Sequence, residues 1–354
     1  MKNQDHIPIS NESREFNIDE LFFSTTDERG VILSGNLVFA RVSGYPMHEL
    51  AGKPHNTIRH PDMPRVVFKL LWDTVKSGKG IAAYVKNLAC DGRHYWVLAM
   101  VAPTEGGYLS VRFKPSSPLF TTVETLYAEL IALENDRIAA GATPQAAIEA
   151  SEARLIAALQ AAGFRDYADF MRRALHQELT SRDAITQHQG LELAAPPPLA
   201  ATGASAEVIT LGKLLRDTRG AYLEISEFGH ELAGSLELHH ELANQSKAIL
   251  VLTQEFHHVP LNVAIKSSQV GDAGRSLSVI AQHLGDAYGG LVGLVTDLTQ
   301  KADSVAHGLS DAVFYLGWAR LQFEMTLIYY RELLNAASGD EATSSRESLA
   351  NSGQ

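Results

Sequence analysis

The chain has 354 residues, of which 45% are hydrophobic, so it is long enough for about two or three domains with ordinary apolar cores. Its formal net charge of −11 at pH 7 argues against nucleic acid or an anionic membrane surface as the main partner. A single cysteine, Cys90, excludes an internal disulfide and any cysteine-rich metal site, which fits a cytoplasmic protein.

Residues 1–20 are a polar N-terminal segment without the apolar run of a secretory signal. From residue 21 to residue 117 the pattern is typical of an α+β domain: a pair of strands, short helices, one longer helix and a three-stranded meander. The longer helix is predicted over 65–76, and Asp91-Gly92 and Gly106-Gly107 predict the turns of the meander, whose strands we expect at 81–88, 94–102 and 107–114. This order is the one expected of a PAS domain, an antiparallel sheet with flanking short helices.

The loop 54–64, before the longer helix, combines prolines with two histidines, an arginine and an aspartate. Proline restricts its own backbone and that of the preceding residue, which predicts a rigid loop and excludes regular helix. Asp62 is expected to cap the helix that begins at Arg65, because a carboxylate is favoured at a helix N-terminus. A capped helix start with a surface cation is the simpler interpretation of the same residues.

Residues 24–114 resemble the PAS domain of Aer-type aerotaxis receptors. The matching pieces include STTD at 24–27, VSGY at 42–45, IRHPDMP at 58–64, VKN at 85–87, HYWV at 94–97 and SVR at 110–112. The resemblance implies a non-covalently bound flavin, FAD, that gauges redox state and is not a catalyst. It carries over Asn36, Arg59, His60, Asp62 and Trp72 as binding positions, and Asn87 and Trp96 join them if the strand register turns them inward.

These residue types suit a flavin. Arg59 and His60 can neutralise a phosphate or donate to a reduced, anionic ring, Asp62 can orient either of them, and Trp72 can supply an aromatic wall. The family's PWSG and the arginine after VKN are replaced here by residues 80–84 (GIAAY) and by Leu88. Haem, with His55 or His60 as axial ligand, and an empty pocket remain alternatives.

Other chemistry has weaker support. Cys90 lies in a predicted turn and lacks the asparagine-cysteine-arginine helix of photoactive flavin domains, so an ordinary thiol is the simpler interpretation. The histidines between 230 and 258 lack the spacing of a zinc protease, and no metal site is predicted. The chain contains no phosphate-binding glycine loop, nucleophile elbow or kinase signature, so we do not expect an enzyme.

Beyond the PAS-like domain the pattern is helical. Residues 118–192 form a helical linker region, with helices predicted from Leu119, over 144–162 and over 166–178. A proline- and alanine-rich linker is predicted at 193–206. Residues 207–337 carry apolar side chains at alternating spacings of three and four, which predicts an antiparallel coiled-coil hairpin or bundle that pairs with a second copy. A disordered tail is predicted at 338–354.

The most apolar helical stretch, 312–330, is interrupted by Arg320, Gln322 and Glu324. Charged side chains are costly in lipid, so no membrane insertion is expected.

The middle of the helical region resembles the hairpin tip of methyl-accepting chemoreceptors, on LNVAI at 261–265 and on residues 270–281. That resemblance implies contact with a chemotaxis kinase, its coupling protein or other chemoreceptors. The segment 266–269 reads KSSQ where the family has EAAR, which argues against kinase coupling. We therefore expect a soluble Aer-like redox or oxygen sensor with a degenerate chemoreceptor-like output. A cofactor-free PAS module that scaffolds or sequesters partner helices is the alternative.

Overall fold

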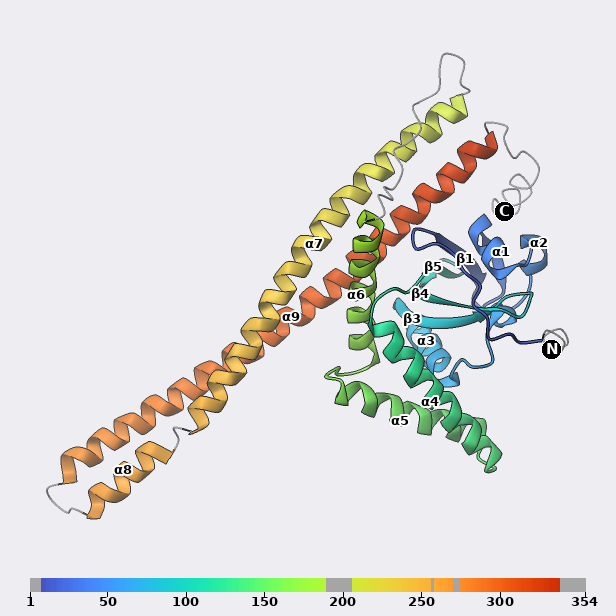
Figure 1. Cartoon of the computed structure of the whole chain (residues 1–354). Helices are drawn as coiled ribbons and strands as arrows, with labels where there is room; N and C mark the ends of the chain where they lie inside the picture. The colour runs from blue at the N-terminus through green and yellow to red at the C-terminus, as the bar shows by residue number, and fades with distance from the viewer. Residues whose placement is uncertain (1–7, 189–205, 256–257, 270–273, 338–354) are drawn as a thin grey trace. The chain divides into compact units, whose positions relative to one another are not determined.

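The computed structural model describes residues 8–188, 206–255, 258–269 and 274–337 (Figure 1). The described residues form two compact units. The first contains the described residues up to Ser226 together with the segment 314–337, and the second contains those between 227 and 313. Residues 207–226, at the start of one long helix, and residues 314–337, at the end of another, therefore group with the first unit, whereas the sequence-based boundaries assign them to a separate hairpin. Residues 1–7, the predicted tail and all of the predicted linker 193–206 except Ala206 lie outside the described residues.

The first unit is built on a five-stranded antiparallel sheet in the order β2-β1-β5-β4-β3. Gly92 and Gly106 turn the chain between the last three strands with φ of 84° and 79°, a conformation that suits glycine. With its flanking short helices this is the PAS fold that the sequence predicts, and the strands are β1 Leu21–Asp27, β2 Ile32–Gly35, β3 Ile81–Leu88, β4 His94–Thr104 and β5 Gly107–Phe113.

Short helices follow β2 and lead to the longer one, as predicted: α1 Leu37–Ser43, α2 Met47–Leu50, the 3-10 helix η1 His55–Ile58 and α3 Arg65–Lys76. Asn36 fixes the first of them, because its side chain accepts from Phe39 N at 3.2 Å and donates to the carbonyl of Leu21 at 3.1 Å. The same side chain therefore sets the distance between β1 and α1.

The register of the strands divides their side chains between two faces of the sheet. Asn87 lies opposite Tyr95 and Lys86 lies opposite Trp96, so Asn87 and Trp96 are on different faces. The face that carries Asn87, here called the inner face, is turned toward α3 and η1. The other, outer face is apolar and fully buried at its centre, where its residues are Leu98, Met100, Val111 and Phe113.

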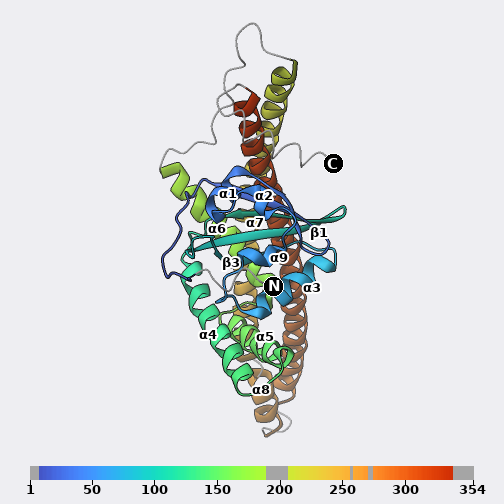
Figure 2. The ribbon, with the colours of Figure 1, turned by 90° about the vertical axis from the view of Figure 1, so that its right-hand side faces the viewer.

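Helices of the same unit follow the sheet: α4 Leu119–Ala139, α5 Pro144–Ala161 and α6 Tyr167–His188. In both views α4 and α5 lie side by side (Figures 1 and 2). Thr143 caps α5 by accepting from Ala146 N at 3.2 Å. The third helix extends beyond the predicted segment 166–178 to His188, and in its second half Arg182 donates to Glu324 at 2.9 Å and Asp183 accepts from Arg320 at 2.6 Å.

Three further helices make up the rest of the described chain: α7 Ala206–Glu255, α8 His258–Gln269 and α9 Arg275–Ala337. Within the second unit α7 and α9 run antiparallel (Figure 1), and Lys247 of α7 forms an ion pair of 3.7 Å with Asp303 of α9. Their buried side chains there are small, as at Ala243 and Ala302. Within the described residues, none of the helices combines the length and the apolar character needed to cross a lipid bilayer.

Candidate functional site: a cavity rich in arginine

The proline-containing loop 54–64 is fixed against the sheet at two points. His55 N donates to the carbonyl of Gly30 at 2.9 Å, and Arg59 forms a bridge with Asn87 on β3. The first contact ties the loop to the turn between β1 and β2, and the second ties it to the opposite edge of the sheet. The loop therefore spans the inner face and covers part of the space beneath it.

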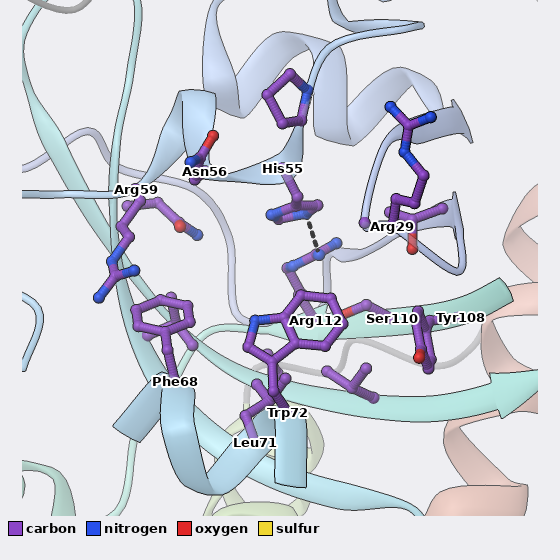
Figure 3. A pocket seen from close by; sticks show the side chains of 17 residues that line it. Arg29, His55, Asn56, Arg59, Phe68, Leu71, Trp72, Tyr108, Ser110 and Arg112 are labelled. Carbon is purple, nitrogen blue, oxygen red and sulfur yellow. Dashed lines mark hydrogen bonds between the residues drawn. The ribbon is translucent and has the colours of Figure 1, made fainter. Parts of the chain in front are cut away.

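This space is a cavity of about 360 Å³, within the range of small-molecule sites in proteins (Figure 3). The loop supplies polar side chains, α3 supplies the apolar and aromatic wall of Phe68, Leu71 and Trp72, and the strands supply the floor. The remaining lining residues are Thr26, Arg29, Gly30, Pro54, His55, Asn56, Arg59, Val85, Asn87, Ala99, Val101, Tyr108, Ser110 and Arg112.

Arg112, on β5, is the most buried cation of the cavity, with 3% of its surface exposed. It donates to Ser24 Oγ at 3.0 Å and to His55 Nε2 at 2.6 Å, the contact marked in Figure 3. Its guanidinium also lies 5.5 Å from the ring centre of Phe39. Among the described residues, Arg112 forms no ion pair with a carboxylate.

The environment of His55 keeps its imidazole neutral at pH 7. Burial and the charge of Arg112 lower its pKa to about 3. Since a guanidinium only donates, Nε2 of His55 must be the acceptor, and its proton is assigned to Nδ1. Burial lowers the pKa of Arg112 to about 10, which leaves Arg112 a cation at pH 7.

Arg59 adds a second cation at the other side of the cavity. Its guanidinium stacks 3.6 Å from the ring centre of Phe68 (Figure 3), and burial lowers its pKa to about 10. With Arg29, three arginines line the cavity, and its lining contains no aspartate or glutamate. The cavity therefore carries a positive potential that favours an anionic ligand.

Two polar atoms in the lining have no hydrogen-bond partner among the described residues. They are Asn87 Nδ2 and Ser110 Oγ, both buried on the inner face. A buried amide or hydroxyl without a partner is costly, so each is explained if a ligand completes its hydrogen bonds. A ligand with polar atoms on the edge of an apolar body would satisfy both.

The structure brings together three of the seven predicted site residues, since Arg59, Trp72 and Asn87 line the cavity. The other four, Asn36, His60, Asp62 and Trp96, do not. Asn36 is buried as the cap of α1, and Trp96 lies on the outer face against Phe120 and Tyr127 of α4.

His60 and Asp62 hold the loop from outside the cavity. His60 is buried, and its Nδ1 accepts from Asp62 N at 3.1 Å. Asp62 is 60% exposed and pairs with Lys86 at 2.8 Å, so the predicted cap on α3 is wrong. Glu134 of α4 takes that place and accepts from Arg65 N at 2.8 Å and from Val66 N at 3.1 Å. Cys90 is exposed, donates to the carbonyl of Gly44, and does not line the cavity.

Sequence reasoning did not include Arg112 and Ser110 in the site, and considered His55 only as a haem ligand. Strand alternation offered one clue, because Tyr108, Ser110 and Arg112 recur at every second position of β5 and share a face. An arginine at an inward-facing position of the sheet is the signal that could have identified Arg112 as a candidate site residue. Its pairing with His55 depends on tertiary structure and has no local pattern.

Comparisons with known proteins agree with the fold. Residues 32–109 match the family described as PAS fold. An aerotaxis receptor from Escherichia coli (strain K12) is 43% identical over 117 residues, which are 32% of this chain and 23% of the receptor. The chain thus matches less than a quarter of that receptor's length.

Two solved structures are similar to this chain over less than a third of its length. A light-oxygen-voltage domain studied with a flavin analogue is 19% identical, over 30% of this chain and 85% of its own, with a TM-score of 0.27. The PAS domain of a protein from Colwellia psychrerythraea is 22% identical, over 27% of this chain and 85% of its own, with a TM-score of 0.23.

Proposed function

We propose that this chain, whose N-terminal part is a PAS domain, is a sensory signal-transduction protein that binds a flavin and responds to its redox state. The observation that carries the proposal is the cavity between the inner face and loop 54–64, with three arginines, no acidic lining residue and two buried polar atoms without a partner among the described residues. The similarity to an aerotaxis receptor over the same domain supports FAD as the flavin.

The lining suits the parts of a flavin. Trp72, Leu71 and Phe68 offer apolar surface to a flat ring system, and Asn87 and Ser110 offer hydrogen bonds to the polar edge of such a ring. Arg59 and Arg112 stabilise negative charge on the ring or on a phosphate. A bound flavin supplies reversible uptake of electrons, and the role of these side chains is to bind it and to favour its charged form.

In this proposal the four predicted residues outside the lining hold other elements in place and do not contact the flavin. Asn36 sets the spacing of β1 and α1, and His60 and Asp62 fix the loop that carries Arg59 and His55. Trp96 packs the outer face against α4. Loss of one of these residues would change the shape of the cavity and leave its chemical groups in place.

Haem has less support. His55 Nε2 is engaged by Arg112 at 2.6 Å, and an iron ligand needs that lone pair. His60 is buried outside the cavity lining. An iron-binding site would need one of these histidines to leave its present partners.

The proposed output is the helical hairpin of the second unit, which pairs with a second copy. Large aliphatic side chains are exposed on both of its arms, as at Leu238 and Leu294, each 71% exposed, while its buried residues are mostly small. A row of exposed leucines on a long helix is typical of a face that pairs with another helix. Coupling to a chemotaxis kinase has less support because of the KSSQ segment, and co-purification with the coupling protein would test it.

Mass spectrometry of the small molecules released from the purified, heat-denatured protein tests the proposal. We expect about one equivalent of flavin per chain, with FAD as the main species. Recovery of haem, or of no chromophore from a protein that also fails to take up added FAD, would overturn it. The second outcome would favour the cofactor-free interaction module.

A further inference from the structure

Loop 54–64 is attached to the edge strand β3 by His60 and its neighbours. His60 N donates to the carbonyl of Lys86 at 3.3 Å, and Asp62 pairs with the ammonium group of Lys86 at 2.8 Å. Asn87, the next residue of β3, forms the bridge with Arg59. The contacts that attach the loop therefore lie beside the contact that positions Arg59 in the cavity.

The imidazole of His60 shapes this part of the loop in its neutral form. Its Nδ1 accepts from the backbone N of Asp62, two residues later, at 3.1 Å. Since a nitrogen that accepts carries no proton, the proton of the neutral ring is assigned to Nε2. The side chain of His60 is 2% exposed, and this Nε2 has no hydrogen-bond partner among the described residues.

A second histidine packs against the first. The ring centres of His60 and His94 lie 6.0 Å apart, in an edge-to-face arrangement. His94 is the first residue of β4, and its Nδ1 is likewise buried with no partner in the part of the chain that the structure describes. Backbone hydrogen bonds with Glu12, at 3.1 Å, and with Arg14, at 2.7 Å, fix this end of β4. We call His60 and His94 the histidine pair.

A proton added to His60 would disturb two contacts of the loop. Nδ1 could no longer accept from Asp62 N, because it would itself carry a proton. The carboxylate of Asp62 lies 3.4 Å from this Nδ1, so a charged His60 would compete with Lys86 for it. Protonation therefore acts on both the turn of the loop and its ion pair with β3.

The charged groups that face the histidine pair are Lys86 of β3, Asp62 of the loop and Glu15 of the N-terminal segment. Burial and the charge of Lys86 lower the pKa of both histidines from their ordinary value of 6.5, and they outweigh the opposite effect of the carboxylates. Both rings are therefore neutral at pH 7, in the form that the contacts above require.

We infer that the histidine pair is an acid-sensitive latch that holds residues 59–63 on β3. Uptake of a proton as the pH falls below about 6.5 releases these residues and moves Arg59 out of the cavity. His55 stays in place, because its backbone is tied separately to Gly30. The release weakens the binding of an anionic ligand, since one of the cavity's cations is withdrawn. That this ligand is a flavin rests on the proposed function, whereas the latch concerns the loop itself.

The latch is closed at neutral pH and opens in acid, because the open form binds more protons. Once the loop is open, each ring regains its ordinary pKa, while in the closed form the pKa stays lower. One such ring favours opening by about tenfold or more between pH 7 and pH 5. By linkage, a ligand that holds the loop closed makes the histidine pair harder to protonate.

Hydrogen-deuterium exchange of residues 59–63 in the full chain, corrected for the pH dependence of chemical exchange, measures the opening of the latch. In the wild type we expect the protection of this segment to fall about tenfold or more between pH 7 and pH 5. His60→Asn removes the titrating ring and keeps an oxygen that can accept from the backbone two residues later. Combined with His94→Gln, it should reduce the response to less than about threefold.

Two other histidines provide the controls. His55→Gln changes the histidine of the cavity, and His48→Gln changes an exposed histidine of α2. Both variants should keep the wild-type response in residues 59–63. A response that disappears in His55→Gln, or that persists in full in the double variant, would overturn the latch.

If the double variant does not fold, NMR of the wild type with ¹⁵N-labelled histidine provides the same decision. Titration of His60 and His94 below their ordinary pKa, together with the amide signals of residues 59–63, is the expected result. Titration of both rings at the ordinary value, or without a change in these amides, would overturn the latch.

The link to the cavity is tested on protein loaded with FAD. Release of FAD should be at least about fivefold faster at pH 5 than at pH 7 in the wild type, and this ratio should fall in the double variant. Equal release at both pH values, in a protein whose loop opens in acid, would overturn the link. A protein that takes up no FAD would instead overturn the proposed function, while the exchange measurement would still decide the latch.

Discussion

At the scale of single residues, Arg112 is central to the cavity. It is a buried cation whose partners among the described residues are a neutral histidine and a serine hydroxyl. A bound anionic group would supply the negative counter-charge that these partners of Arg112 do not provide. Hydrogen bonds from a charged group contribute about 1.5–3 kcal/mol, so this one side chain can decide whether the ligand is retained.

Arg112→Met is therefore expected to lower flavin affinity by at least about tenfold, because it removes the charge and keeps an apolar side chain of similar length. The measurement is the flavin-to-protein ratio of the purified variant and a titration with FAD. Arg93→Met, which changes an exposed arginine paired with Asp91 outside the cavity, is the control. Equal flavin affinity in wild type and Arg112→Met would remove Arg112 from the site.

His55 gives the domain a predictable response to acid. Its pKa is about 3 in the folded protein, chiefly through burial, against about 6.5 in the unfolded chain, so the unfolded state binds more protons between these values. Its contribution to stability is complete above pH 6.5 and is lost as the pH falls toward 3. Between pH 7 and pH 5 the loss is about 2 kcal/mol.

The free energy of unfolding of wild type should therefore fall by about 2 kcal/mol more than that of His55→Gln between pH 7 and pH 5. Denaturant titrations at the two pH values measure this difference. His48→Gln, which changes an exposed histidine, should keep the wild-type pH dependence. Parallel pH dependence in wild type and His55→Gln would contradict the buried, neutral state of His55.

At the scale of elements, α3 depends on a residue far away in the sequence. Glu134 of α4 is fully buried and accepts from the first two backbone N–H groups of α3, which carries Phe68 and Trp72 into the cavity. A proline precedes α3 and no side chain of its own loop caps it. The position of one wall of the cavity is therefore set by the helix that follows the sheet.

Glu134→Ala is expected to lower the free energy of unfolding by about 2 kcal/mol or more, because it leaves buried N–H groups without an acceptor. Glu129→Ala on the same helix removes an exposed ion pair with Arg154 and should cost less than about 0.5 kcal/mol. Chemical denaturation of both variants measures the difference. Equal losses would mean that solvent or other groups replace the Glu134 carboxylate.

The sequence predicted most elements because their patterns are local. Strand alternation and glycine turns located the meander, and the helix 65–76 has the predicted bounds. The sequence did not determine which face of the sheet each strand residue occupies, because a shift of register by one residue reverses the faces. The observed register puts Asn87 on the inner face and Trp96 on the outer face. The cap on α3 was wrong because Glu134 is 69 residues away from Arg65.

The end of α9 illustrates a second limit. Its apolar spacing suits both a coiled coil and a helix packed on a sheet, and the sequence alone favoured the coiled coil. The contact of Trp318 with Gly80 and the partners of Arg320 and Glu324 exist only in the folded chain. Residues 207–226 and 314–337 of the predicted hairpin therefore group with the compact unit that contains the sheet.

At the scale of the whole molecule, we expect a homodimer. The exposed leucines of the second unit should bring two copies together, which gives a mass of 77 kDa, twice the 38.5 kDa of the chain. Sedimentation equilibrium measures this mass. The combined change Leu238→Glu and Leu294→Glu should produce a monomer, whereas Glu237→Gln should not. A wild-type monomer at micromolar concentration would contradict pairing through the hairpin.

We propose above that the cavity holds a flavin whose redox state the protein senses. The visible absorption spectrum of the full chain, purified in the dark and in air, then reduced without oxygen and returned to air, tests this directly. We predict a two-band flavin spectrum that bleaches on reduction and recovers in air. A single intense Soret band, or a protein that stays colourless after incubation with FAD, would contradict it.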